Sequence, residues 1–330
     1  MQKKIALLHR YPEDCIQETN ASFRYLKAKG MDVLTFKKFD RLKNWKKFFK
    51  SIAWIFYAPC LVAGRGYDVI YCDDSYPFYP ALVKMASPCS RVVIRLGDLH
   101  LMYHYSGITF KMLHFLEKIG WLLADEIICI SEVMADYVEK EIGKRPKVAL
   151  DPVDPKDFPP HLSYNTGTVM FHGTLTKNKN VDILFEAAKL MPETEFTIIG
   201  DGPDFNRLKR IAPSNVFLFG WAPFRQIYEH ISYCAVGVAL RSDNPGNEYV
   251  VTSPFLQYGI MGKPCLVTRR KVFGDYEWQF SGVHELVAKL QYLLEYPQDG
   301  HGKRLKEYVL LNHNAVNIAG RIWQILTQVL

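Results

Sequence analysis

Residues 168–190, TVMFHGTLTKNKNVDILFEAAKL, hold the pattern that decides the fold. The apolar run at 168–171 is strand-like, the loop after it contains glycine and lysine, and a stretch with helical periodicity begins at Val181. The same order of apolar run, loop and helix repeats along the chain, which is typical of stacked βαβ units around a parallel sheet. We therefore predict an α/β protein.

The expected strands are short apolar or β-branched runs separated by helical stretches. One expected helix covers 18–29 and ends at Gly30, and another follows Ser131, whose hydroxyl suits a helix N-cap. In the first half, the expected strands are 4–9, 32–36, 68–72, 91–95, 126–130 and 147–150. In the second half, they are 168–171, 195–200, 216–219, 236–240 and 265–268.

Residues 151–160, DPVDPKDFPP, mark the domain boundary, because four prolines in ten residues can continue neither a helix nor a strand. We expect two doubly wound, Rossmann-like domains, 1–155 and 156–313, that face a central cleft, and a last helix at 314–330. Ligands of open parallel sheets bind at the carboxyl ends of the strands. The loops at those ends are therefore the candidate site.

Composition favours a soluble globular protein, since 48% of the 330 residues are hydrophobic and 23% are charged. The positive net charge of +7 is concentrated near the N-terminus. The first 65 residues carry 14 Lys or Arg and 5 Asp or Glu, and the remainder is slightly acidic. One basic block points to a single anionic surface rather than to nucleic acid.

Targeting and redox signals indicate a cytoplasmic protein. The seven cysteines are scattered and contain no C-x-x-C pair, so we expect neither a disulfide framework nor a zinc site. The N-terminus has no signal-peptide pattern. The longest apolar stretch, 52–63, has 12 residues and includes Pro59, which is too short to span a bilayer.

Three loops of the second half have residues that suit an anionic ligand. In 172–180, Gly173 allows close approach of a ligand, and lysines precede a helix whose first N–H groups are free, although a plain solvated loop fits as well. The turn Gly200-Asp-Gly-Pro203 is not a dinucleotide fingerprint, because position 205 is Phe. At 252–264, we expect a helix with Ser253 as its N-cap and Pro254 as its first residue. The free backbone amides at the start of this helix would suit a phosphate.

Together these loops resemble the nucleotide-sugar domain of glycosyltransferase family 4, which has the GT-B fold. Gly173, Lys179 and Asn180 match the motif G-R-x-x-x-x-K-G/N, with Thr174 at the arginine position, and G-D-G-P is intact at 200–203. The end of E-A-M-A-x-G-x-P matches at 262–264, so that Gln257 takes the place of the glutamate. Two first-half segments, 124–132 and 153–158, resemble further family motifs, and the resemblance covers nearly the whole chain.

The resemblance implies transfer of a sugar from a nucleoside diphosphate sugar, with retention and without a metal or other cofactor. Lys179 and Arg241 are then the cations for the leaving diphosphate. Gln257 and Glu248 are the candidates for the ribose. The other expected donor-binding residues are Gly173, Thr174, Gly200, Gly202, Thr252 and Ser253.

The first domain is then the acceptor domain, and the last helix crosses back to it. Asp98 and His100, in the loop after the strand at 91–95, are candidates for contact with the acceptor or the transferred sugar. Asp98 could instead cap the next turn. Arg10 is a further acceptor candidate, and the pair His100 and His104 lacks the additional ligands of a metal site.

Residues 43–56 predict an amphipathic helix with one basic and one aromatic side. Such a helix suits an anionic membrane surface, although the aromatic side could equally pack on the N-terminal sheet. The basic side has Lys43, Lys46, Lys47 and Lys50. The aromatic side has Trp45, Phe48, Phe49, Ile52, Ile55 and Phe56.

The sequence thus predicts a cytoplasmic glycosyltransferase, peripheral on the membrane, which acts on a polysaccharide or lipid-linked acceptor in cell-surface glycan assembly. An alternative hypothesis is a non-catalytic subunit that binds nucleotide sugars or a protein partner. It follows from the departures from the family motifs at Thr174, Tyr249 and Gln257. A GT-B epimerase of nucleotide sugars would need paired carboxylates, and no pair is evident in the sequence.

Overall fold

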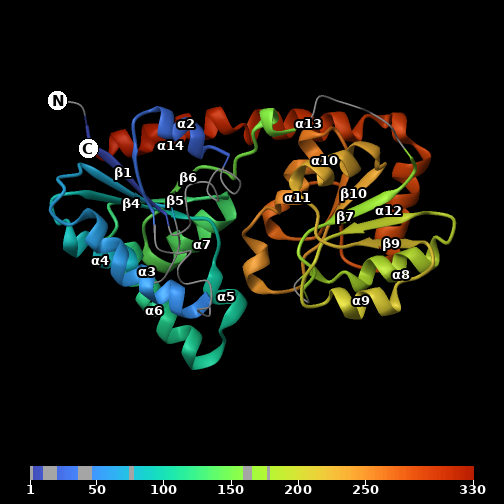
Figure 1. Ribbon diagram of the computed structural model, residues 1–330, viewed down its shortest axis with the longest axis horizontal. Coiled ribbons are helices and arrows are strands. Elements are labelled where there is room, and N and C mark those ends of the chain that lie inside the picture. Colours follow the sequence, from blue (N-terminus) through green and yellow to red (C-terminus); the bar gives the residue numbers. More distant parts are fainter. Residues whose placement is uncertain (1–2, 10–20, 36–46, 74–77, 159–165, 177–178) are drawn as a thin grey trace. The chain divides into compact units, whose positions relative to one another are not determined.

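The computed structural model describes residues 3–9, 21–35, 47–73, 78–158, 166–176 and 179–330, with the backbone alone for 47–52 (Figure 1). It divides into two compact units. Unit 1 comprises Met1–Pro152 and Ala315–Leu330, and unit 2 comprises Val153–Asn314. The division thus falls three residues before the boundary expected after 155, and the last helix begins one residue later than expected.

Unit 1 contains a parallel six-stranded sheet with the strand order β2-β1-β3-β4-β5-β6. Its central strands are buried on both faces, as a sheet covered by helices requires. The strands are β1 (Ile5–His9), β2 (Asp32–Thr35), β3 (Val69–Cys72), β4 (Arg91–Leu96), β5 (Glu126–Cys129) and β6 (Lys147–Val148).

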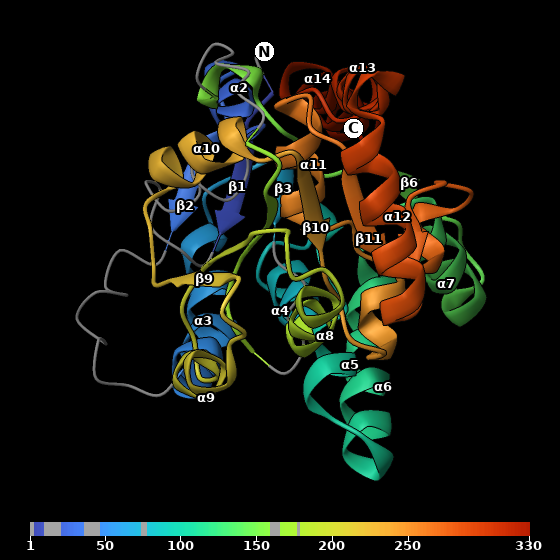
Figure 2. The same ribbon diagram turned by 90° about the vertical axis from the view of Figure 1, so that its right-hand side faces the viewer.

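The helices of unit 1 cover both faces of this sheet. Figures 1 and 2 show α2 and α14 on one face and α3 and α4 on the other. The last helix packs Ile318 and Ile322 in the same core as Ile5 and Leu7 of β1, so it belongs to unit 1. The helices are α2 (Phe23–Ala28), α3 (Lys47–Val62), α4 (Tyr79–Ala86), α5 (His100–His104), α6 (Gly107–Leu123), α7 (Glu132–Ile142) and α14 (Ala315–Gln328).

Helix α7 shows how local sequence sets an element. The Ser131 hydroxyl accepts a hydrogen bond from the Met134 amide at 3.1 Å, as expected of an N-cap. Gly143, in the left-handed conformation with φ of 72°, ends the helix.

Helix α3 corrects one interpretation of the basic and aromatic segment. Trp54, Ala58 and Val62, spaced four residues apart, form its buried side. Phe56, from the side expected to pack on the sheet, is 66% exposed. The packing alternative is therefore wrong at Phe56. Among the described residues, no helix is both long and apolar enough to cross a membrane.

Unit 2 repeats the architecture with the strand order β12-β11-β10-β7-β8-β9, all parallel. The strands are β7 (Val169–His172), β8 (Phe196–Ile199), β9 (Val216–Phe219), β10 (Val236–Ala239), β11 (Cys265–Thr268) and β12 (Gln279–Phe280). The helices are α8 (Asp182–Leu190), α9 (Phe205–Ile211), α10 (Phe224–Tyr233), α11 (Ser253–Ile260), α12 (Val283–Glu295) and α13 (His301–Asn312). Short 3₁₀ turns include η4 (Pro245–Glu248) and η5 (Lys271–Phe273).

The predicted α/β fold is confirmed in both units. The predicted strand ends differ from the observed ones by at most two residues, and only β12, a strand of two residues, was not expected. A close contact between α11 and the sheet positions the candidate site: Tyr258 of α11 packs against Gly237 of β10, where a Cβ would lie 2.3 Å from the ring. The Tyr258 hydroxyl donates to the Met170 carbonyl in β7 at 2.9 Å.

Candidate functional site

The loops after β7 and β8 pack directly on each other. A Cβ on Gly200 would lie 1.9 Å from the Gly173 carbonyl oxygen, and one on Gly202 would lie 2.4 Å from the Leu175 carbonyl oxygen. Backbone hydrogen bonds from Gly173 to Ile199 and from Leu175 to Asp201 join the same loops. Packing of the two loops therefore explains both glycines of the G-D-G-P turn, which the sequence assigned to donor binding.

The β7 end places His172 beside Lys179. The imidazole is 5% exposed and contacts the Tyr258 ring, with the ring centroids 5.2 Å apart. Burial, together with the charge of Lys179, lowers the His172 pKa to about 3, so the ring is neutral. Its Nε2 atom is buried and has no hydrogen-bond partner among the described residues. Thr174 is exposed on the same loop.

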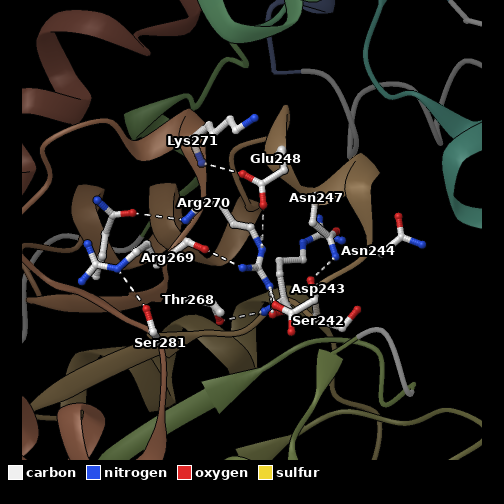
Figure 3. A network of polar contacts seen from close by, with 12 residues as sticks. Ser242, Asp243, Asn244, Asn247, Glu248, Thr268, Arg269, Arg270, Lys271 and Ser281 are labelled. Carbon is white, nitrogen blue, oxygen red and sulfur yellow. Dashed lines mark hydrogen bonds and ion pairs between the residues drawn. The ribbon is translucent and has the colours of Figure 1, made fainter.

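The β10 end places Arg241 in a loop fixed by a second arginine, Arg270, which Figure 3 shows beside Asp243 and Glu248. The Arg241 amide donates to Thr268 Oγ1 at 3.0 Å. Arg270, only 8% exposed, donates through Nη2 to the Arg241 carbonyl and to Asp243 Oδ1, both at 2.9 Å. In the described part of the chain, the buried Arg241 Nε has no hydrogen-bond partner. The sequence offered no signal for Arg270 beyond a basic residue soon after a buried strand.

Glu248 is already engaged in this network. Its Oε2 accepts a hydrogen bond from the Lys271 amide at 2.9 Å, and its Oε1 lies 3.9 Å from Arg270 Nε. The carboxylate thus ties η4 to η5. A role of Glu248 with a ribose would require the side chain to leave these contacts or to share them.

The N-terminus of α11 differs from the expected cap by one residue. Thr252 is the N-cap, and its Oγ1 accepts from the Phe255 amide at 3.4 Å, whereas Ser253 is the first helical residue. The expectation of Ser253 as N-cap was therefore wrong. One turn further, Gln257 has a buried Oε1 without a partner among the described residues.

Arg270 Nε, 3.9 Å from Glu248 Oε1, has no hydrogen-bond partner among the described residues, and neither do the buried atoms His172 Nε2, Arg241 Nε and Gln257 Oε1. The last three atoms lie at the carboxyl ends of the paired strands β7 and β10 and on α11, which packs on both strands. A buried polar atom that lacks a hydrogen bond costs about 1–3 kcal/mol. A ligand that supplies these bonds is the simplest explanation for their common location.

In unit 1, the loop after β4 places Asp98 and His100. Asp98 Oδ1 accepts a hydrogen bond from the Leu99 amide at 2.8 Å, but the N-cap of the next helix, α5, is Leu99, and no side chain caps it. The capping alternative for Asp98 is therefore wrong. His100 is the first residue of the short helix α5. Among the described residues, no group of three His, Cys, Asp or Glu side chains could hold a metal ion.

The same sheet edge has a charged cluster that the sequence analysis missed. Arg95, 8% exposed, contacts Asp73 Oδ1 at 3.2 Å and Asp151 Oδ1 at 2.6 Å. Burial raises the Asp151 pKa, although Arg95 opposes the shift. An arginine near the end of an otherwise apolar strand was the available signal. Both carboxylates bind one guanidinium, so the pair does not form the acid and base that an epimerase needs.

Several predicted residues lie outside the described residues or have only a backbone there. Arg10, Lys43, Trp45 and Lys46 are outside them. The structure describes only the backbone of Lys47, Phe48, Phe49 and Lys50, at the start of α3.

Solved structures of glycosyltransferases share this architecture over almost their whole length. Anabaena HepE in complex with UDP matches with a TM-score of 0.70 at 15% identity, over 98% of this chain and 100% of that chain. Sucrose-phosphate synthase from Thermosynechococcus elongatus matches with a TM-score of 0.74 at 13% identity, over 99% of both chains. A glycosyltransferase from Rickettsia africae ESF-5 gives 0.73 at 10% identity, over 99% of this chain and 98% of that chain.

These matches show that the chain has the GT-B fold, as its resemblance to family 4 predicted. No protein-family model matches the chain, and no curated protein matches it either. The assignment of the fold therefore rests on structural similarity at low sequence identity.

Proposed function

We propose that the protein is a glycosyltransferase that takes a sugar from a nucleoside diphosphate sugar bound to unit 2. The observation that carries the proposal is that buried polar atoms of His172, Arg241 and Gln257 have no hydrogen-bond partner among the described residues. The UDP in the similar HepE structure supports the choice of ligand. A nucleoside diphosphate has phosphate oxygens for cations and ribose hydroxyls for an amide oxygen.

In this proposal, Lys179 and Arg241 neutralise the leaving diphosphate as the bond to the anomeric carbon breaks. Fixed cations stabilise charge that develops in a transition state without reorganisation, so no metal is needed. Arg270 positions Arg241 through the Arg241 carbonyl. Gln257 binds the ribose, and Thr174, exposed at the arginine position of the motif, donates its hydroxyl to a phosphate.

Unit 1 is proposed to bind the acceptor, with Asp98, His100 and Arg10 as contacts. Arg95, Asp73 and Asp151 fix the sheet edge that carries Asp98 and His100. As the bond between the anomeric carbon and the diphosphate breaks, the acceptor oxygen bonds to that carbon, and its proton passes to the leaving diphosphate. The resemblance to family 4 is the basis for two further parts of the proposal. The reaction retains the configuration of the sugar, and the acceptor is a cell-surface polysaccharide or glycolipid.

A peripheral position on the cytoplasmic face of a membrane is also part of the proposal. Helix α6 has an apolar strip of Ile108, Met112, Phe115 and Leu122, each more than 60% exposed. Their spacing of four, three and seven residues places them on one side of the helix. Monomeric soluble proteins rarely expose large apolar patches, which usually mark an interaction surface.

The charge distribution supports an anionic bilayer as the partner of this strip. Unit 1 has 24 Lys or Arg and 17 Asp or Glu, whereas unit 2 has 17 of each. The one acid of α6, Glu117, is buried, and Lys111 beside the strip is exposed. An apolar helix side flanked by cationic residues is typical of helices that lie in a membrane interface.

The experiment is release of nucleotide diphosphate from a panel of UDP-, GDP-, ADP- and TDP-sugars in EDTA, with glycan and lipid-linked acceptors. We expect turnover of one donor and a 10- to 100-fold lower kcat/KM for Arg241→Ala. Arg225→Ala is the matched control, because the Arg225 side chain is 92% exposed on α10. Binding of a nucleotide sugar without any turnover would instead support the non-catalytic subunit, which the engaged Glu248 favours.

A further inference from the structure

A pocket of unit 2, of about 550 Å³, lies beside α11, between η5 and α13. Its lining includes Phe255 of α11, residues 272, 273 and 275–278, and four residues of α13: His301, Arg304, Leu305 and Tyr308. Phe255 and Gln257 are two positions apart, which places them about 200° apart around the helix. The pocket is therefore on a different side of α11 from the proposed donor site.

The walls of this pocket are mainly aromatic. The rings of Phe255, Phe273 and Tyr276 meet edge to face or tilted, with the centroids of Phe255 and Phe273 5.1 Å apart. Trp278 lies edge-on to His301, with centroids 4.4 Å apart. Aromatic walls offer apolar faces of fixed orientation to a ligand that has its own apolar ring face.

Polar groups converge at the rim of the pocket. Glu277 Oε1 accepts from Trp278 Nε1 at 2.8 Å and lies 3.9 Å from Arg304 Nη2. Arg304 Nη1 donates to the Asp299 carbonyl at 2.6 Å. The side chains of Glu277 and Arg304 are both more than half exposed, and Arg304 Nη2 also contacts His301 Nδ1. A carboxylate beside a guanidinium presents acceptors and donors at the spacing of neighbouring hydroxyl groups.

The charge balance of the lining disfavours a phosphate. Asp275 and Glu277 contribute two carboxylates, whereas Arg304 is the single Lys or Arg of the lining. A neutral ring with C–H faces and hydroxyl edges matches the aromatic walls and the polar rim together. The volume lies within the range of pockets that bind small molecules and is large enough for one or two sugar rings.

We propose that this pocket binds a neutral glycosyl unit of the glycan on which the enzyme acts, at a site separate from the donor site. The choice of a glycan rests on the proposed function. Tyr308, exposed on α13, and Arg304 are the residues that hold the unit at the mouth. Such a site keeps a long acceptor or product on the enzyme between transfers.

The test is isothermal titration with maltopentaose, cellopentaose and chitopentaose, each against protein saturated with UDP. We expect at least one oligosaccharide to bind, and Tyr308→Ala and Arg304→Ala each to weaken it at least tenfold. Tyr296→Ala is the matched control, because Tyr296 has similar exposure and does not line the pocket. It should bind as the wild type does.

Stabilisation of the same variants by UDP separates this inference from the proposed function. We expect the UDP-induced rise in Tm to be unchanged in Tyr308→Ala and Arg304→Ala, since neither residue lines the donor site. The inference is overturned if none of the three oligosaccharides binds at 10 mM, or if both variants bind as the wild type does. A missing UDP response would contradict the proposed donor site instead.

Discussion

Gly200 lies so close to Gly173 that a Cβ at Gly200 would be 1.9 Å from the Gly173 carbonyl oxygen. This contact joins the loop after β8 to the loop that carries Thr174 and Lys179. The cation and the hydroxyl proposed for the diphosphate therefore depend on a glycine that need not touch the ligand.

Gly200→Ala is expected to destabilise the protein by about 2 kcal/mol or more, because backbone must move to make room for the methyl group. Gly220→Ala is the matched control, since a Cβ there meets nothing within 4 Å. Thermal unfolding checks both variants. Equal Tm values for the two would show that the loops do not need this contact.

His172 predicts a specific loss of stability in acid. Its pKa of about 3 in the folded state lies below the ordinary 6.5, so the unfolded state binds one more proton between these pH values. Stability is therefore present above pH 6.5 and falls as the pH drops toward 3. His172→Gln should reduce the slope by up to about 1.4 kcal/mol per pH unit in urea unfolding.

The control for this prediction is His284→Gln, which removes an exposed histidine of the same unit. Its pH dependence should match that of the wild type. If His172→Gln loses stability with falling pH as steeply as the wild type, His172 is not buried in its neutral form.

Arg95 and Arg91 lie on the same strand, but we expect their replacement to destabilise the protein to very different extents. Arg95→Ala would leave Asp73 and Asp151 without their shared cation, at an expected cost of about 3–5 kcal/mol. Arg91, which is 54% exposed, pairs with Asp125, and Arg91→Ala should cost less than about 1 kcal/mol. Urea unfolding measures both losses. Similar small losses would remove the structural role given to the Arg95 cluster.

The sequence predicted the fold because periodicity and turn residues are local signals. Apolar runs such as 216–219 and the cap at Ser131 are encoded by neighbouring residues. The burial of α3 was not predictable in this way. Its aromatic and basic sides are clear in the sequence, but the side that packs, with Trp54, is decided by tertiary contacts with partners such as Tyr79.

The sequence indicated which loops form the candidate site, but it did not indicate most of the side-chain contacts within them. Strand ends and glycines located the loops of Gly173 and Arg241, since parallel strands bring their carboxyl ends to one edge. The roles of Arg270 and Asp151 depend on residues 27 and 56 positions away in the chain. Such long-range pairs leave no periodic signal in a single sequence.

The membrane proposal predicts that Phe115→Glu and Met112→Glu abolish binding to liposomes that contain phosphatidylglycerol, because charge on the α6 strip opposes insertion. Leu311→Glu, at a 76% exposed position of unit 2, should bind normally. Reversal of the charge of Lys43, Lys46, Lys47 and Lys50 to Glu should also abolish binding. Sedimentation of all these variants with the liposomes, as for the wild type, would contradict the membrane proposal.

The most direct test of a nucleotide-sugar site in unit 2 is thermal unfolding in EDTA with UDP, GDP, ADP, CMP or TDP. We expect one diphosphate to stabilise the protein by about 2.7 kcal/mol at 100 times its Kd. Lys179→Ala should lose this effect, whereas Lys189→Ala, at an exposed position of α8, should keep it. No response to any nucleotide, or a full response in Lys179→Ala, would contradict the account.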